Sequence, residues 1–406
     1  AEGLGIFQLV MPLQILALAF CASGIQTAIS RLTASREALG CPGRAGDYFI
    51  SGTLFSVLFS LVLSFLFYYR ADFWAVKILK EPRTASLIRM MAPAVPLSTL
   101  HTCINSYYFG RKKAGLPAGI QLLEQAFRVG GCYVIYLVCI SEKRTVTPLM
   151  AAGGNLIGET AACIASLFFI SMHFKEIHYS FFQLQKPLVL LKELFHISVP
   201  LSLNKILLTV LGSMEVILIP GRLQMSGLNA SDALSIYGIF TGMALPLILF
   251  PATLTNSVSV MLLLSVTELQ TLGYQKRIRY VIRQIFRYCV FLGGACMLLF
   301  LFFGKYMGIF LFHSTTAGTY IRTMSFICPF LYLNTTLTSV LNGLGRSGIC
   351  LIHSAVSLCI RVAFVLFAIP IFGIRGYLYG ILFSELILTV LHIIALSALG
   401  NLSEKH

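Results

Sequence analysis

Eleven long apolar segments recur along this chain of 406 residues, and they restrict what it can fold into more than any other feature. A helix needs about 20 apolar residues to cross the hydrocarbon core of a bilayer. Inside that core, helices satisfy their own backbone hydrogen bonds. We therefore predict an all-α polytopic membrane protein. The segments are 5–31, 49–69, 87–109, 117–140, 147–173, 195–220, 235–265, 280–303, 318–342, 348–371 and 376–399.

The composition excludes several other classes of protein. Charged residues make up 11% of the chain, whereas a soluble domain carries about 25%. The net charge of +15 would indicate nucleic acid in a soluble protein, but here the basic residues lie mostly in short loops. The positive-inside bias explains that distribution, so no nucleic-acid partner is expected. The 11 cysteines form no CxxC pair and lie mostly in apolar segments, which argues against metal or cofactor binding.

The loops predict an orientation. Basic residues favour one set of alternate loops by 16 to 11. This bias places loops 32–48, 110–116, 174–194 and 268–279 in the cytoplasm, together with the C-terminus. The chain begins at Ala1 rather than at Met. We expect a first helix to be missing, which would bring eleven visible helices to twelve.

The longest cytoplasmic loop divides the chain into two halves. We predict an N-terminal half-bundle over 1–174, a linker over 175–194 and a C-terminal half-bundle over 195–406. An offset of 233 aligns 88–129 with 321–362 without a gap, and eleven positions are identical. Such a parallel repeat is a transporter architecture with its site between the halves. The register is fixed by Pro96/Pro329, Gly110/Gly343, Gly115/Gly348 and Arg128/Arg361, among others.

Three cations lie deep in apolar segments: Arg128, Lys205 and Arg361. Arg128 follows Pro117 by 11 residues, which places it about 16 Å into the membrane. A charge at that depth is costly and normally faces the bundle interior. The three cations belong to polar helical faces that we expect to line a cleft. These faces are Gln121, Glu124, Gln125, Arg128; Ser354, Ser357, Arg361; and Ser202, Lys205, Thr209, Ser213; nearby, His101 and Asn105 correspond to Asn334 and Thr338.

Each cation also has a structural interpretation. Glu124 precedes Arg128 by four residues and would form a helical ion pair with it. Arg361 has Ser357 in the equivalent place, so it is expected to be less compensated, unless Glu385 or Glu159 reaches it. Lys205 would snorkel to the inner face if its helix begins late. Glu215 is expected at a wetted helix end.

Proline and sequence motifs add two further expectations. Pro246 and Pro251 interrupt one segment and predict a bend. No Walker A, HExxH or GxSxG motif is present, so no enzyme is predicted.

Several short motifs resemble the stage V sporulation protein B family. They are Tyr107-Tyr108-Phe109-Gly110, Pro117-Ala118, Glu124-Gln125, Arg128-Val129, and segments 217–222, 237–252, 255–259 and 341–346. That family is part of the multidrug/oligosaccharidyl-lipid/polysaccharide (MOP) exporter superfamily, which includes the MATE drug exporters. The resemblance implies two six-helix bundles in a V, alternating access and a lipid-linked saccharide as cargo. It also implies that the family's first helix, which carries charged cavity residues, is absent here.

We therefore expect a flippase in the bacterial cytoplasmic membrane that moves a polysaccharide or peptidoglycan precursor, with H⁺ or Na⁺ as a candidate coupling ion. Two alternatives stay open. One is a cation-coupled MATE-type drug antiporter, and the other is a non-transporting scaffold for cell-wall or sporulation enzymes. The predicted cavity residues are Arg361, Arg128, Lys205, Glu124, Gln125, Asn105 and Asn334.

Overall fold

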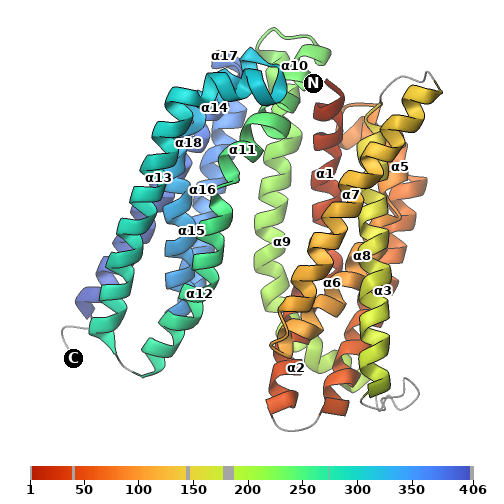
Figure 1. Ribbon diagram of the computed structural model, residues 1–406, viewed down its shortest axis with the longest axis vertical. Coiled ribbons are helices and arrows are strands. Elements are labelled where there is room, and N and C mark those ends of the chain that lie inside the picture. The colour runs from red at the N-terminus through yellow and green to blue at the C-terminus, as the bar shows by residue number, and fades with distance from the viewer. Residues whose placement is uncertain (1, 39–41, 143–146, 177–186, 273, 403–406) are drawn as a thin grey trace. The chain divides into compact units, whose positions relative to one another are not determined.

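The computed structural model describes residues 2–38, 42–142, 147–176, 187–272 and 274–402, and in these ranges it contains helices and no strand (Figure 1). Clustering of the backbone divides the chain into two compact units. The N-terminal unit is Leu9–Ser213, and the C-terminal unit is Ala1–Gln8 together with Met214–His406. The predicted division at a 175–194 linker stays a prediction, and most of that linker, 177–186, lies outside the described residues.

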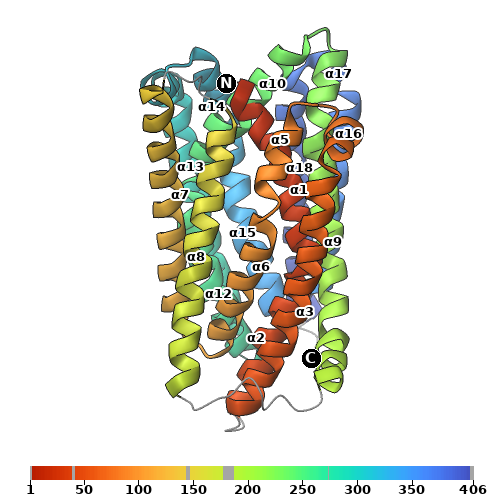
Figure 2. The same cartoon turned by 90° about the vertical axis from the view of Figure 1, so that its right-hand side faces the viewer.

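The described part of the N-terminal unit consists of seven long helices, of which α1 and α9 belong to it only in part, and three short helical elements. Its elements are α1 (Glu2–Cys21), α2 (Ser23–Ala38), α3 (Pro42–Tyr69), α4 (Ala71–Phe73), the π-helix η1 (Trp74–Ile78), α5 (Thr84–Met91), α6 (Ala94–Gly110), α7 (Gly115–Ser141), α8 (Leu149–Glu176) and most of α9 (Pro187–Met225). Helices α6, α7 and α8 run side by side (Figures 1 and 2). The core of this unit joins α2, α3, α6 and α8 around buried Tyr107 and Phe49, whose ring centroids are 5.0 Å apart.

The C-terminal unit begins within α9, at Met214. Its other elements are α10 (Ala230–Ile239), the π-helix η3 (Phe240–Ala244), α11 (Leu245–Leu249), α12 (Ala252–Thr271), α13 (Gln275–Phe312), α14 (Thr315–Met324), the 3₁₀ turn η4 (Ser325–Ile327), α15 (Cys328–Gly343), α16 (Ser347–Phe367), α17 (Ile369–Phe372) and α18 (Ile374–Leu402). Helix α15 packs against α12, α13 and α18. The core of the C-terminal unit includes the fully buried side chains of Tyr237, Phe240 and Tyr332.

Ten helices in the described part of the chain are long and apolar enough to cross a membrane. They correspond to ten of the eleven predicted segments. The remaining segment, 87–109, is divided at Ala92 and Pro93 into α5 of 8 residues and α6 of 17 residues. Each piece alone is shorter than a span because Pro93 interrupts the helical hydrogen bonds. The all-α multi-pass prediction is confirmed.

The segment with two prolines is interrupted as expected. Helix α10 passes into η3 just before Pro246, and α11 ends at Leu249, before Pro251. Tyr332 on α15 donates a hydrogen bond of 2.9 Å to the carbonyl of Ile248 near this break. A side chain from a neighbouring helix thus satisfies a backbone group at a break in the helix, as a membrane interior demands.

Candidate functional site: two buried ion-pair clusters

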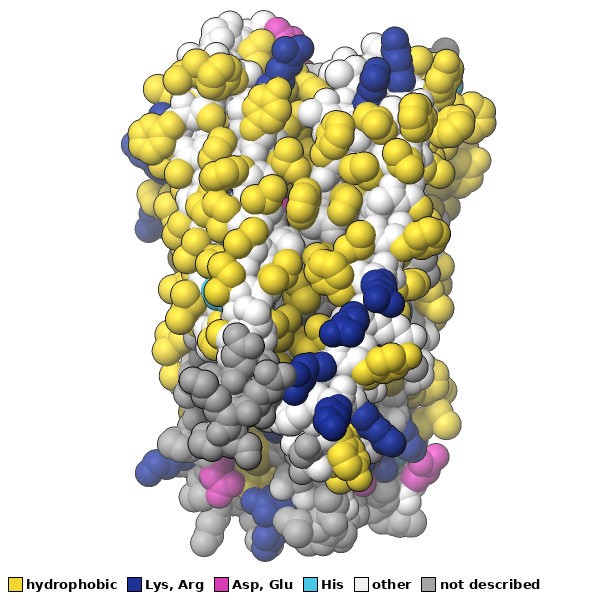
Figure 3. Space-filling view, turned by 90° about the vertical axis from the view of Figure 1, so that its left-hand side faces the viewer, with side chains coloured by type: hydrophobic (Ala, Val, Ile, Leu, Met, Phe, Trp, Pro, Cys, Tyr) yellow, Lys and Arg dark blue, Asp and Glu magenta, His cyan; other side chains and the backbone are white. Residues whose placement is uncertain are grey.

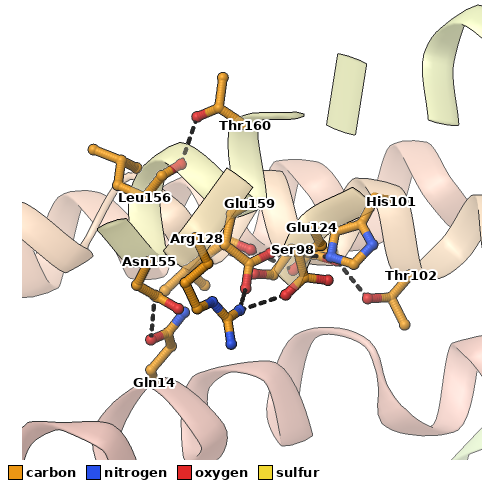
Figure 4. Close-up of polar contacts among 12 residues, drawn as sticks. Gln14, Ser98, His101, Thr102, Glu124, Arg128, Asn155, Leu156, Glu159 and Thr160 are labelled. Atoms are coloured by element: carbon orange, nitrogen blue, oxygen red, sulfur yellow. Dashed lines mark hydrogen bonds and ion pairs between the residues drawn. The ribbon is translucent and has the colours of Figure 1, made fainter. Parts of the chain in front are cut away.

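A buried cluster of charged side chains lies in the N-terminal unit and is drawn in Figure 4. Arg128 on α7 forms an ion pair with Glu124, one turn earlier on the same helix. The Nη2 atom of Arg128 also lies 3.5 Å from Oε1 of Glu159 on α8. The other carboxylate oxygen of Glu159 is 3.0 Å from Nε2 of His101 on α6. Two carboxylates, one arginine and one histidine therefore meet where three helices pack together.

A neutral pair extends this cluster along α8. Asn155 lies one turn before Glu159, and its Nδ2 donates a hydrogen bond of 3.2 Å to Oε1 of Gln14 on α1 (Figure 4). Both side chains are buried. Because buried amides cost free energy unless they are paired, this bond fixes α1 against α8 beside the charged cluster.

Small residues allow α8 to approach α7 at the cluster. Gly154 and Gly158 are four residues apart and form a GxxxG motif, which permits close helix packing in membranes. A Cβ atom on Gly158 would lie 2.9 Å from the carbonyl oxygen of Glu124 and 3.0 Å from Cβ of Arg128. The motif therefore places Glu159, the next residue, within reach of Arg128.

The C-terminal unit contains a second cluster of the same kind. Nη2 of Arg361 on α16 lies 3.1 Å from Oε2 of Glu215 on α9, and Nη1 lies 3.9 Å from Oε1 of Glu385 on α18. Tyr377 donates a hydrogen bond of 2.9 Å to the other oxygen of Glu215. Asn334 on α15 donates one of 2.7 Å to Glu385. Two carboxylates again share one arginine.

The two clusters are related by the internal repeat. Offset 233 pairs His101 with Asn334 and Arg128 with Arg361, as the sequence predicted. The glutamates on α8 and α18 match at a different offset, 226, which pairs Gly154, Gly158 and Glu159 with Gly380, Ser384 and Glu385. Both glutamates thus follow a motif of two small residues spaced four apart. This motif was a signal that could have revealed the glutamates from the sequence.

Two expectations about the C-terminal cluster were wrong. Arg361 is not less compensated than Arg128, because both Glu215 and Glu385 reach it. Glu215 is not a wetted helix end, since it is 3% exposed. The apolar pattern suggested that its helix ends near residue 220, whereas α9 continues to Met225. Glu215 therefore lies ten residues before the end of α9, which corresponds to about 15 Å.

Other expectations about pairing are confirmed. Glu124 does pair with Arg128. Of the two candidate partners for Arg361, Glu385 reaches it, while Glu159 pairs with Arg128 instead.

The other predicted cavity residues lie outside these ion pairs. Gln125 and Lys205 are exposed, and Asn105 is half-buried one turn after His101. The side-chain oxygen of Asn105 is buried and has no hydrogen-bond partner among the residues that the structure describes. Of the seven predicted residues, the structure brings Arg128 and Glu124 together in one unit and Arg361 and Asn334 in the other. Sequence reasoning gave no role to the hydrogen bond from Tyr377 to Glu215, which depends on the packing of α18 against α9.

Comparison with known proteins supports this fold. The family model described as polysaccharide biosynthesis protein matches residues 1–263. Stage V sporulation protein B of Bacillus subtilis is 25% identical over 413 aligned residues, covering 100% of this chain and 79% of that protein. A multidrug resistance MATE family transporter of the MOP superfamily, solved facing inward, is similar with a TM-score of 0.73 at 13% identity, over 100% of this chain and 92% of that one.

A second solved structure has a similar fold. Lipid II flippase MurJ, in an inward closed conformation, is similar with a TM-score of 0.73 at 14% identity, over 98% of this chain and 82% of that one. These likenesses show a MATE-like fold. They agree, at the level of the fold, with the transporter architecture that the sequence predicts.

Proposed function

The chain belongs to the polysaccharide biosynthesis protein family, and from this premise we propose that it is a flippase for a lipid-linked saccharide. The cargo would be a precursor of a polysaccharide or of peptidoglycan, moved across the bacterial cytoplasmic membrane by alternating access. The proposal agrees with the likeness to stage V sporulation protein B and to a lipid II flippase. In this proposal the two half-bundles, 1–174 and 195–406, rock about the cargo, which is the usual behaviour of such repeats.

The observation that carries the proposal is the pair of repeat-related ion clusters inside membrane-spanning helices. Side chains of Glu159 and Glu215 are 8% and 4% exposed, although each carries a charge when ionised. Ionisable groups are expensive in a membrane and normally mark substrate paths or proton relays. Two such clusters, one in each unit, support transport better than a purely structural role.

The clusters also indicate how each residue would act. In each, two carboxylates share one arginine, so the formal charge is −1 when all are ionised and the histidine is neutral. Arg128 and Arg361 are thereby neutralised, and they are poor anchors for an anionic cargo. We propose instead that the clusters exchange H⁺ or Na⁺, because binding one cation restores neutrality. Lys205, with Gln125 and Asn105, is the proposed contact for the cargo's pyrophosphate and sugar.

A reconstitution experiment tests the function. The protein would be placed in vesicles containing a fluorescent polyprenyl-pyrophosphate saccharide, and arrival of the headgroup at the outer surface would be measured by enzymatic cleavage. We expect translocation that responds to an imposed pH or Na⁺ gradient. Glu159→Gln and Glu385→Gln should each weaken that response, whereas Gln125→Ala should leave it intact while altering cargo affinity.

One observation also favours an alternative function. Net negative clusters also suit a cation-coupled multidrug antiporter of the MATE type, and MATE transporters share this fold. The same vesicles distinguish the two functions. Export of cationic dyes on an ion gradient, without movement of any polyprenyl-linked saccharide, would establish the antiporter. A non-transporting scaffold would move neither cargo, and its partner binding would tolerate both glutamine substitutions.

A further inference from the structure

Helix α13 is much longer than a membrane crossing requires. It has 38 residues, Gln275–Phe312, which corresponds to about 57 Å. The part that follows Arg287 already supplies the roughly 20 residues of a span. The first turns of the helix, Gln275–Arg287, therefore extend beyond the hydrocarbon core, on the side that the loop charges predict to be cytoplasmic.

This extension carries a basic stripe, which we define as Lys276, Arg277, Arg279, Arg283 and Arg287. All five side chains are exposed. Four of them are spaced by three or four residues, so they follow one helical face. The helix contains no Asp or Glu from Gln275 to Phe312. Figure 3 looks onto the side of the molecule that carries α13 and shows Lys and Arg side chains in a diagonal row below a mostly hydrophobic surface.

The opposite face of the extension is fixed to the protein. Ile278 is 3% exposed. Val281, Ile282 and Ile285 pack against a buried cluster formed by Leu262, Val266 and Val340. The basic stripe is therefore the outward face of a rigid, two-faced helix. Its charges keep a fixed spacing, as they would not on a flexible tail.

Aromatic side chains accompany the stripe. Tyr274, Tyr280 and Tyr288 are 49%, 69% and 42% exposed. The guanidinium of Arg277 lies 5.2 Å from the ring centroid of Tyr274. Exposed tyrosines concentrate at the level of lipid headgroups. Arginine forks match the geometry of phosphate oxygens.

We propose that the basic stripe of α13 is a binding site for the phosphate groups of anionic phospholipids in the cytoplasmic leaflet. Charge complementarity, the rigid spacing of the cations, the neighbouring tyrosines and continuity with a membrane-spanning helix all favour this ligand. Basic clusters directly beside a membrane span attract anionic lipids in this way. The site is separate from both ion-pair clusters, and the inference does not depend on the identity of the cargo.

A fluorescence-quenching experiment tests the proposal. Because the chain has one tryptophan, Trp74→Phe combined with Tyr280→Trp gives a single reporter beside the stripe. The protein is reconstituted in phosphatidylcholine with a minor fraction of phosphatidylglycerol. Two samples are compared, one with brominated phosphatidylcholine and one with brominated phosphatidylglycerol. We expect brominated phosphatidylglycerol to quench as if enriched at least about twofold over its bulk fraction, with the excess falling at high salt.

Matched neutralisations provide the control. Lys276→Gln, Arg283→Gln and Arg287→Gln together should abolish the excess quenching. Lys305→Gln, Arg322→Gln and Arg375→Gln remove the same charge from exposed sites elsewhere and should preserve it. Equal quenching by the two brominated lipids, or an excess that persists in the stripe variant, would overturn the proposal. If the triple variant does not fold, the excess quenching of the protein with the intact stripe is measured as the salt concentration is raised. Binding of the stripe to phosphate predicts that the excess falls with salt. An excess that does not fall would show that aromatic insertion alone causes it, and this would also overturn the proposal.

Discussion

The ion-pair clusters of the two units have a similar arrangement of side chains, but they differ in which helix carries the second carboxylate. In both, an arginine on one long helix pairs with a glutamate on the next long helix, and a polar side chain from a third helix lies within hydrogen-bond distance of that glutamate. In the N-terminal unit the second carboxylate, Glu124, lies on the arginine's own helix. In the C-terminal unit it is Glu215, which comes from α9 and is also held by Tyr377. The ion pairs of Arg128 therefore join two helices, α7 and α8, whereas those of Arg361 join three, α9, α16 and α18. The same charges should therefore contribute unequally to stability.

The largest effect is expected from Arg361→Ala. It leaves Glu215 and Glu385 buried without a cation, and breaking a buried ion pair costs about 3–5 kcal/mol. The measurement is the yield of monodisperse protein in detergent, together with its melting temperature. Arg361→Lys should recover part of the loss, because it keeps the charge. A normal melting temperature for Arg361→Ala would show that the cluster does not join the helices.

Arg128→Ala should destabilise less, by about 2 kcal/mol. Glu159 keeps His101 as a partner, and the side chain of Glu124 is 11% exposed, against 4% for the side chain of Glu215. The same melting experiment compares the two alanine variants. Adding Glu124→Gln to Arg128→Ala should recover stability, because it removes the unpaired charge. A loss equal to that of Arg361→Ala would contradict the distinction between ion pairs that join two helices and ion pairs that join three.

Gly158→Ala should cost about 1–2 kcal/mol by overpacking the contact between α7 and α8. The new methyl group would meet the backbone of Glu124 and the Cβ of Arg128, neither of which can move freely. Gly119 and Gly130 on α7 are matched controls, since a Cβ on either meets no atom within 4 Å. Alanine at those positions should be neutral or slightly stabilising. Chemical denaturation in detergent would measure all three variants, and three equal results would refute the close approach.

The smallest effect is expected from His101→Asn. The substitution gives the N-terminal cluster the amide that the C-terminal cluster has at Asn334. An amide can donate a hydrogen bond to Glu159 in place of the imidazole, so the variant should lose less than about 1 kcal/mol of stability in the same melting experiment. His101→Ala removes this partner of Glu159 and should cost more, about 1–3 kcal/mol. Equal losses for the two variants would show that the contact between His101 and Glu159 does not stabilise the cluster.

Much of the architecture was predictable because it depends on local periodicity. Segment length and hydropathy identified the membrane helices, and Pro246 and Pro251 located the interruptions in their segment. The ion pair of Glu124 with Arg128 was predictable for the same reason, since residues four apart on a helix are always neighbours. The repeat also paired His101 with Asn334 and Arg128 with Arg361 before their helices were placed.

The tertiary structure alone decided which side chains neutralise Arg361 and how deeply Glu215 is buried. Both depend on the length of α9 and its rotation against α16 and α18, and an apolar segment specifies neither. The same limit applies to Glu159. The distance of Glu159 from Arg128 depends on how closely α7 and α8 approach each other. Gly158 permits a close approach, but the hydrophobic pattern does not predict it. Sequence by itself thus determined the helices, the repeat and the pairs within one helix, whereas pairs between helices required the packing, because residues far apart in the chain meet only when their helices do.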